Sequence, residues 1–403
     1  MNDLAVFSLL FLAIAIGWLL GRRSAPSSVN APELPSQYYK GLNDILDGRP
    51  DGAIDSFINA LEVNTETLET HIALGNLLRK KGEVERAIRI HQNLLARPSL
   101  PRLQVHQAHL ELARDYISAG LYDRAERLLL DLLEESPEQR RAGQMHLLEI
   151  YQSQRDWQRA IEIAGDMLPR KSLLNSASDA EAGSWLGQDV AIVLPHLYCE
   201  LAAEYMQKGE LEEARRLLLQ AFSRDKHCVR AAIMLGEVEL GLGNHRRAIK
   251  SLRRVRQQDA DYVPETLPTL RRCYVELGEE HAYREYLMHC LERNPSAPLV
   301  LALAEALRSS GGEEEAAGFL TEQLARQPSL RGLERLIRMQ LEAADDGARD
   351  SLELLHLLVE RLIEERPAYR CSHCGFSGRN LHWSCPSCKY WGTMKSIRGS
   401  RKE

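Results

Sequence analysis

Hydrophobic and polar positions divide the chain into five stretches. Residues 1–21 contain one apolar run, and residues 22–35 are rich in proline and serine, which predicts an extended linker. Through residues 36–348, apolar positions recur at helical spacing between glycine turns. Residues 349–367 continue as an amphipathic helix, and residues 368–403 hold four clustered cysteines. The pattern predicts an all-α fold that ends in a small cysteine-rich segment.

A turn marker repeats through residues 36–348 with a period near 34 residues. The marker is a glycine at a turn between two helices, followed five residues later by a small alanine, which predicts about eight helix–turn–helix units. One interval, of 54 residues, is longer than the others and contains an insertion near residues 169–195. The markers are Gly48/Ala53, Gly82/Ala87, Gly120/Ala125, Gly209/Ala214, Gly243/Ala248 and Gly311/Ala316, with variants at Gly278/Tyr283 and Arg155/Ala160.

This repeat resembles the tetratricopeptide repeat, a 34-residue helix pair that stacks into a superhelical solenoid with a concave binding groove. The resemblance covers roughly residues 36–330 and implies that the marked glycines, alanines and leucines are scaffold. Insertions in solenoids often decorate a binding face, so residues 169–195 are a candidate partner contact.

The apolar run at residues 4–20 has one polar member, Ser8, and is followed by Arg22 and Arg23. The positive-inside rule keeps these arginines cytoplasmic, which predicts an uncleaved single-pass transmembrane anchor with the short N-terminus outside. The alternative, a cleaved signal peptide, needs a basic segment before the apolar run, and the chain starts Met1-Asn2-Asp3 instead.

Composition narrows the class of protein. Charged residues make up 27 % of the chain and the formal net charge is −6, which argues against a general nucleic-acid binder. The absence of a secreted disulfide pattern favours a reducing compartment. We expect the four scattered cysteines to be buried apolar residues: Cys199, Cys228, Cys273 and Cys290.

The remaining four cysteines form two Cys-x-x-Cys pairs with ten residues between them: Cys371, Cys374, Cys385 and Cys388. This spacing predicts two hairpin-like knuckles that place four thiolates around one metal ion, against the alternatives of chance clustering or disulfides. Four thiolates close the coordination sphere, and they suit zinc and iron equally. We therefore expect His373 and His382 to be surface residues or partner contacts.

The segment around these cysteines is too short to bury a core without a metal. Gly375 is expected at positive φ in the first knuckle. We call the whole segment from residue 368 onward, with both Cys-x-x-Cys pairs, the knuckle. Because three residues separate Pro367 from Cys371, we expect the knuckle to dock on the end of the solenoid. We expect five aromatic residues to shield the sulfurs and to pack on the last helices: Tyr369, Phe376, Trp383, Tyr390 and Trp391.

The sequences Cys-x-x-Cys-Gly and Cys-Pro-x-Cys resemble a rubredoxin-type knuckle. The resemblance implies a metal site. Electron-carrier rubredoxins have a longer gap between the pairs, and this difference makes a redox role doubtful. The tail beyond the site is basic, with Lys389, Lys395, Arg398, Arg401 and Lys402. It fits either a patch for anionic lipid or nucleic acid, or a solubilising terminus.

The ordered combination of anchor, solenoid and four-cysteine knuckle resembles the lipopolysaccharide assembly protein B family of Gram-negative bacteria. The resemblance implies an inner-membrane adaptor without enzymatic activity, its N-terminus periplasmic and its bulk cytoplasmic. It further implies that a membrane-bound AAA+ protease and the lipid A-committing UDP-3-O-acyl-N-acetylglucosamine deacetylase are partners, the adaptor promoting degradation of the deacetylase. Further implied partners are other membrane proteins of lipopolysaccharide synthesis or transport, and homo-oligomerisation stays open. Carried over residue by residue, the metal ligands are Cys371, Cys374, Cys385 and Cys388.

Two other classes of function stay open. An iron-containing redox protein would follow from the rubredoxin likeness, and a nucleic-acid-binding zinc ribbon from the basic tail. An enzyme is disfavoured because the sequence has no metalloprotease helix motif, no phosphate-binding loop and no nucleophile–base pair.

Overall fold

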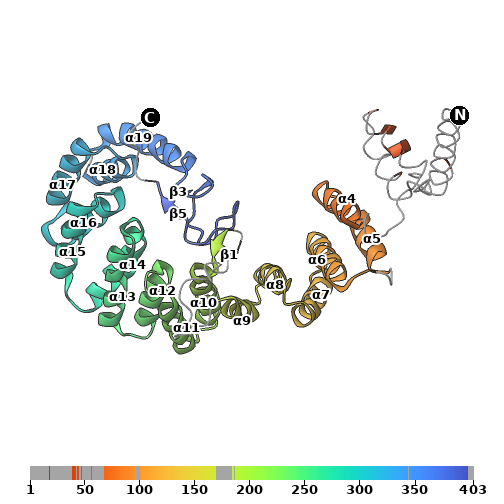
Figure 1. Ribbon diagram of the computed structural model, residues 1–403. Helices are drawn as coiled ribbons and strands as arrows, with labels where there is room; N and C mark the ends of the chain where they lie inside the picture. The colour runs from red at the N-terminus through yellow and green to blue at the C-terminus, as the bar shows by residue number, and fades with distance from the viewer. Residues whose placement is uncertain are drawn as a thin grey trace, which may run out of the picture. The chain divides into compact units, whose positions relative to one another are not determined.

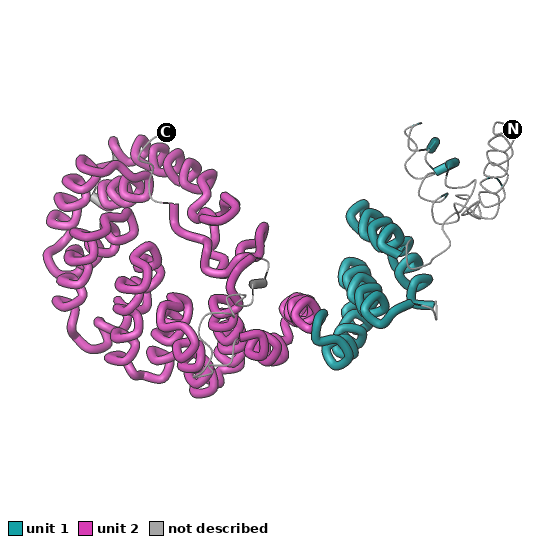
Figure 2. The backbone as a smooth tube through the Cα atoms, viewed as in Figure 1, with its two compact units in different colours: residues 1–139 teal, residues 140–403 magenta. Residues whose placement is uncertain are grey.

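Antiparallel helix pairs make up most of the structure, a computed structural model (Figure 1). It describes residues 68–96, 100–168, 184–185, 187–343 and 345–397, together with residues 18, 39–41, 43, 44, 47 and 56. The chain divides into two compact units, residues 1–139 and residues 140–403 (Figure 2). The mainly helical fold of tetratricopeptide type with a small cysteine-rich C-terminal region is confirmed.

In the first unit, the described helices form two hairpins. Their bounds are α4 (Leu68–Lys80), α5 (Val84–Leu95), α6 (Arg102–Ser118) and α7 (Tyr122–Glu135).

In the second unit, further helix pairs follow one another along an arc, and the C-terminal strands turn back to its inner side (Figure 1). The helices are α8 (Arg140–Gln154), α9 (Trp157–Met167), α10 (Val190–Gln207), α11 (Leu211–Arg224), α12 (Val229–Gly241), α13 (His245–Gln258), the 3₁₀ helix η1 (Ala260–Tyr262), α14 (Val263–Glu276), α15 (Glu280–Arg293), α16 (Ala297–Gly311), α17 (Glu313–Arg326), α18 (Leu330–Ala343) and α19 (Asp346–Glu365). The strands are β1 (Ser184–Trp185), β2 (Gln188–Asp189), β3 (Tyr369–Cys371), β4 (Ser377–Gly378) and β5 (Met394–Ser396).

The predicted turn glycines lie where the chain reverses between paired helices. Gly82 has φ +85°, and the next N–H, of Glu83, donates back to the carbonyl of Leu78 at 2.9 Å. This closes the first helix and starts the second one in the opposite direction. Arg155 takes the same left-handed conformation, with φ +59°, where the glycine is missing from the pattern. In the unit marked by Gly311, the positive φ belongs to the neighbouring Gly312 instead.

The small residues of the repeat let the two helices of a hairpin approach closely. A Cβ built on Gly236 would lie 2.4 Å from a Leu252 side-chain atom, closer than real Cβ contacts come. The alanine of each described marker pair is fully buried: Ala87, Ala125, Ala160, Ala214, Ala248 and Ala316. The pair Gly48/Ala53 lies outside the described residues.

The predicted membrane placement needs correction. A bilayer-spanning helix requires about 20 predominantly apolar residues. Across the described ranges, no helix is both long and apolar enough to cross a membrane, and α10, 18 residues long, contains Glu200 and Glu204. This finding contradicts the single-pass inner-membrane topology, and no span is assigned. The apolar run at residues 4–20 lies outside the described residues apart from Trp18.

Candidate metal centre

A small antiparallel sheet supports the cysteine pairs, with strand order β4-β3-β5. Its register places Tyr369 opposite both Gly378 and Ser396, and Cys371 opposite Met394. Cys371, Cys385 and Met394 are buried together, with Phe376 and Leu381 packed against them. The sheet is thus too small for a core of its own, and the sulfurs form the centre of the segment.

The four Sγ atoms lie within 4.8 Å of one another. Cys371 Sγ is 3.8 Å from Cys388 Sγ, and Cys374 Sγ is 3.7 Å from Cys385 Sγ. A tetrahedron with metal–sulfur bonds of about 2.3 Å has sulfur–sulfur edges of about 3.8 Å, whereas a disulfide bond measures about 2.05 Å. The cluster therefore fits one metal ion, and the distances leave zinc and iron both open.

Hydrogen bonds around the sulfurs favour thiolates unevenly. Burial alone would raise the pKa of Cys371, but the Thr393 hydroxyl, 3.2 Å from Cys371 Sγ, and nearby backbone amides outweigh it and lower that pKa to about 6. Burial, together with the neighbouring sulfurs, raises the pKa of Cys388 to about 12. Four negative charges so close together need a compensating cation, which a bound metal would supply.

The two Cys-x-x-Cys turns share one backbone conformation, with positive φ at the residue after the second cysteine, but that residue differs between them. Gly375 has φ +79°, as predicted, and its N–H donates to the Cys371 carbonyl at 3.0 Å. Lys389 holds the equivalent place after the second pair, with φ +63°, and its N–H donates to the Cys385 carbonyl at 2.9 Å. A non-glycine residue in this conformation is strained by about 1 kcal/mol.

The knuckle docks on the middle of the arc, so the expectation that it docks on the end of the solenoid is wrong (Figure 1). The side chain of Gln188 makes two hydrogen bonds to the backbone of Trp391. Its amide oxygen accepts from the Trp391 N–H at 2.9 Å, and its amide nitrogen donates to the Trp391 carbonyl at 2.9 Å. The Tyr262 hydroxyl donates to the Met394 carbonyl at 2.7 Å. Strand β2 and helix η1 therefore bond directly to the backbone of the knuckle.

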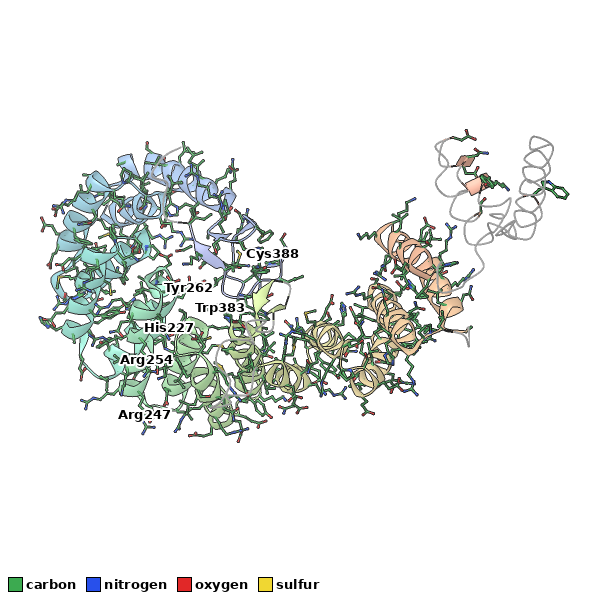
Figure 3. The ribbon with its side chains drawn as sticks, viewed as in Figure 1. His227, Arg247, Arg254, Tyr262, Trp383 and Cys388 are labelled. Carbon is green, nitrogen blue, oxygen red and sulfur yellow. The ribbon has the colours of Figure 1, made fainter. Side chains whose placement is uncertain are left out.

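The two tryptophans of the knuckle pack on rings of the arc instead of on the last helices. Trp391 stacks on His196 with ring centroids 5.2 Å apart, and Trp383 stacks on Tyr262 at 5.3 Å. The Arg230 guanidinium lies 5.8 Å and 5.9 Å from the two indole centroids. Figure 3 labels Trp383 and Tyr262 side by side on the inner side of the arc.

Burial at this interface changes protonation. It lowers the pKa of His196 to about 3, with a smaller contribution from the charge of Arg230, so the imidazole is neutral at pH 7. Burial also raises the pKa of Tyr262, which keeps the hydroxyl proton available for its hydrogen bonds.

Charged pairs complete the dock at its edge. Lys395 Nζ lies 2.9 Å from an Asp259 carboxylate oxygen and 3.4 Å from one of Asp261. The Tyr369 hydroxyl donates to Glu265 at 2.7 Å. Lys395 is therefore bound within the protein, not part of a free basic patch. Lys389 is exposed at the second turn, and the basic residues from Arg398 onward lie outside the described residues.

The described end of the 169–195 insertion contacts the chain's own knuckle. Strands β1 and β2 form a hairpin with Ser184 opposite Asp189, and Gly187 at its turn has φ +86°. A Cβ on Gly187 would lie 2.4 Å from the Tyr390 hydroxyl, so the hairpin passes very close to the second knuckle turn. Residues 169–183 lie outside the described residues.

The other expectations about cysteines and histidines agree with the structure. Cys199, Cys228, Cys273 and Cys290 are all buried and free. His373 and His382 are exposed, and His373 stacks on Tyr390 at 3.7 Å between centroids.

A second group of possible ligand atoms comes from Glu334, His356 and Glu360, within 4.8 Å of one another. Arg338 lies 2.6 Å from Glu334 and 3.9 Å from Glu360, so both carboxylates already have a cationic partner. We assign no metal there.

Comparisons with known families agree with this geometry. Residues 369–396 match the family described as Rubredoxin metal binding domain. Residues 70–105, 110–172 and 199–263 match families described as Tetratricopeptide repeat.

Two relatives match over nearly the whole chain. Lipopolysaccharide assembly protein B of Escherichia coli (strain K12) is 39 % identical over 398 residues, which cover 98 % of each chain. The protein of the same name from Haemophilus influenzae is 34 % identical over 403 residues, covering 97 % of this chain and 98 % of the relative. Among solved structures, Naa15/Naa10 bound to HypK-THB is similar with a TM-score of 0.42 and 16 % identity, covering 82 % of this chain and 47 % of that chain.

Proposed function

The chain belongs to the lipopolysaccharide assembly protein B family, and we propose that it is a non-catalytic adaptor in the control of lipopolysaccharide synthesis. The observation that carries the proposal is the dock of the knuckle on the inner side of the arc. Trp383, Trp391 and Lys395 tie the knuckle to η1, α10 and α12. In the proposed adaptor, the docked metal centre is part of the scaffold that binds partners.

The proposed ligands of the metal are Cys371, Cys374, Cys385 and Cys388. Four thiolates leave no coordination position for a substrate, so the metal would fix the fold of the knuckle and the position of its tryptophans. The solenoid supplies extended surface for proteins, the usual role of such repeats.

In its finer form, the proposal is that the adaptor brings the UDP-3-O-acyl-N-acetylglucosamine deacetylase to a membrane-bound AAA+ protease and so shortens the lifetime of the deacetylase. Other proteins of lipopolysaccharide synthesis or transport are further proposed partners. Support for this form comes from the family and from the combination of a protein-binding solenoid with a closed metal site.

The experiment is a measurement of deacetylase half-life after protein synthesis is stopped, in cells of the source organism depleted of the chain. We expect depletion to lengthen the half-life severalfold and the wild-type chain to restore it. A Cys371→Ser chain should restore it poorly, while His281→Gln, at an exposed position far from the knuckle in sequence, should restore it fully. An unchanged half-life on depletion would refute the protease-adaptor form of the proposal.

A further inference from the structure

The outer side of α13 carries positive charge that the repeat fold pairs only in part and that the metal centre does not contact. The helix contains no carboxylate, in a chain whose net charge is −6. Figure 3 shows Arg247 on the outer side of the arc, away from the knuckle. Five exposed residues make up what we call the α13 basic face: Arg246, Arg247, Lys250, Arg253 and Arg254.

The adjacent repeats do not share this charge. Helices α11 and α15 hold the same place in the adjacent repeats, 34 and 35 residues away. Where α13 has Arg246 and Arg247, α11 has the exposed Glu212 and Glu213. Cations in the first turn of a helix oppose its dipole and reduce its stability. Arg246 and Arg247 therefore do not serve the stability of α13.

Few carboxylates of the described residues neutralise this face. Arg246, whose side chain is 82 % exposed, has a long ion pair with Glu279 at 3.5 Å. Within the same ranges of the chain, Arg247 and Lys250 have no carboxylate oxygen within ion-pair distance. The guanidinium of Arg254 lies 5.6 Å from the ring centroid of Phe222, which holds its side chain in place. A partner would meet largely uncompensated positive charges.

Exposed apolar side chains flank the basic face on both sides. Leu219 of α11 is 50 % exposed and Met288 of α15 is 47 % exposed. Both hold the repeat position of Arg253, so the three residues form a row across neighbouring helices. Arginine and methionine are both enriched in protein interfaces, whereas a polyphosphate needs charge alone.

We propose that the outer surface of α11, α13 and α15 binds an acidic, amphipathic segment of another protein. Its carboxylates would pair with Arg247, Lys250 and Arg254, and its apolar side chains would cover Leu219 and Met288. The proposal stands on the surface alone and does not depend on the deacetylase or the protease named above.

The test measures binding of the full chain to a fluorescent twelve-residue peptide that repeats Glu-Glu-Leu, by anisotropy at low salt. The variant Arg247→Gln/Lys250→Gln should bind about fivefold more weakly, the effect of losing two surface ion pairs. The control Arg349→Gln/Arg361→Gln removes the same charge from exposed positions of α19, outside the proposed surface, and should bind within about twofold of wild type. Leu219→Ser/Met288→Ser should also weaken binding, and circular dichroism checks that each variant is folded.

Several outcomes would overturn the proposal. One is equal weakening in the α13 variant and the α19 control, and another is equal binding of the peptide with Gln in place of Glu. Binding of tripolyphosphate as tight as that of the peptide, with no effect of Leu219→Ser/Met288→Ser, would mark a simple polyanion site. Self-association that the Arg247→Gln/Lys250→Gln variant abolishes would identify a second copy as the occupant.

Discussion

At the scale of single residues, Gly375 and Lys389 meet the same requirement with different side chains. Both have positive φ at the end of a metal-binding turn, and both donate an N–H back to the first cysteine of their pair. Glycine adopts this conformation without strain, whereas lysine adopts it against a steric penalty. The second turn is thus held in shape by its surroundings, including the docked hairpin near Tyr390.

The two turns should therefore respond differently to substitution. Gly375→Ala should lower the free energy of unfolding by about 1 kcal/mol, because alanine is strained at positive φ. Lys389→Gly should be nearly neutral, because relief of strain offsets the greater entropy of glycine in the unfolded chain. Thermal denaturation and the rate of metal release to a chelator measure both. Equal losses in the two variants would contradict the assignment.

His196 makes the dock sensitive to acid. The unfolded chain binds a proton at this residue near pH 6.5, and the folded chain does so only near pH 3. Between these values the unfolded state holds more protons, so the free energy of unfolding falls as the pH falls.

From pH 6.5 to pH 5 the loss should reach about 1.6 kcal/mol. The difference in urea midpoint between pH 6.5 and pH 5 should shrink in His196→Phe, which keeps a ring for Trp391 to stack on. The exposed His281→Gln should leave that difference as in wild type. A His196→Phe variant as acid-sensitive as wild type would show that other groups cause the effect.

The sequence indicated the cysteines and the tryptophans of the knuckle but not their partners on the arc. The four cysteines lie within 18 residues, so their spacing alone indicates the geometry of the site. Gln188 and Trp391 are 203 residues apart, and no local pattern in one indicates the other. The sequence did offer a signal for the second turn. Lys389 directly follows the second cysteine pair, as Gly375 follows the first pair, so the positive φ of Lys389 could have been predicted.

At the scale of elements, the helix pairs follow from local rules. A glycine that permits positive φ ends one helix, and a small residue lets the next helix pack closely against it. These signals act over a few residues, which explains why the repeat was predictable. The hairpin β1–β2 was not, because its strands are two residues long and their contacts are with the distant knuckle.

The close-approach role of glycine can be tested with a matched pair. Gly236→Ala places a Cβ 2.4 Å from Leu252 and should cost about 1–3 kcal/mol of stability through overpacking. Gly318→Ala, inside α17 with nothing within 4 Å of the added Cβ, should stabilise by about 0.5–1 kcal/mol through helix propensity. Urea denaturation followed by circular dichroism measures both. A destabilising Gly318→Ala would argue against this account.

At the scale of the whole molecule, the metal should control whether the knuckle stays docked. Removing it with a chelator, or by Cys371→Ser, leaves the small sheet without a core. The buried Trp391 and the half-buried Trp383 should then reach solvent, and tryptophan emission should shift to longer wavelength. The metal content should fall from one ion per chain to none, and the same elemental analysis decides between zinc and iron. Cys290→Ala is the control and should keep both the metal and the emission. Unchanged emission after complete loss of metal would show that the dock holds without it.

The bonds from Tyr262 and Gln188 to the knuckle also change how the C-terminal repeats can unfold. In an open solenoid each repeat contacts its neighbours only, so the last repeat frays first. Here the segment from α14 to α19 is held at both ends. Its start continues covalently from η1, and its end leads into the knuckle, which bonds back to Tyr262 and Gln188, so the segment forms a closed loop. Cutting that loop, as metal loss would, should let the final helices open one pair at a time. The bound ion would then determine how many of the C-terminal repeats unfold together as one cooperative unit.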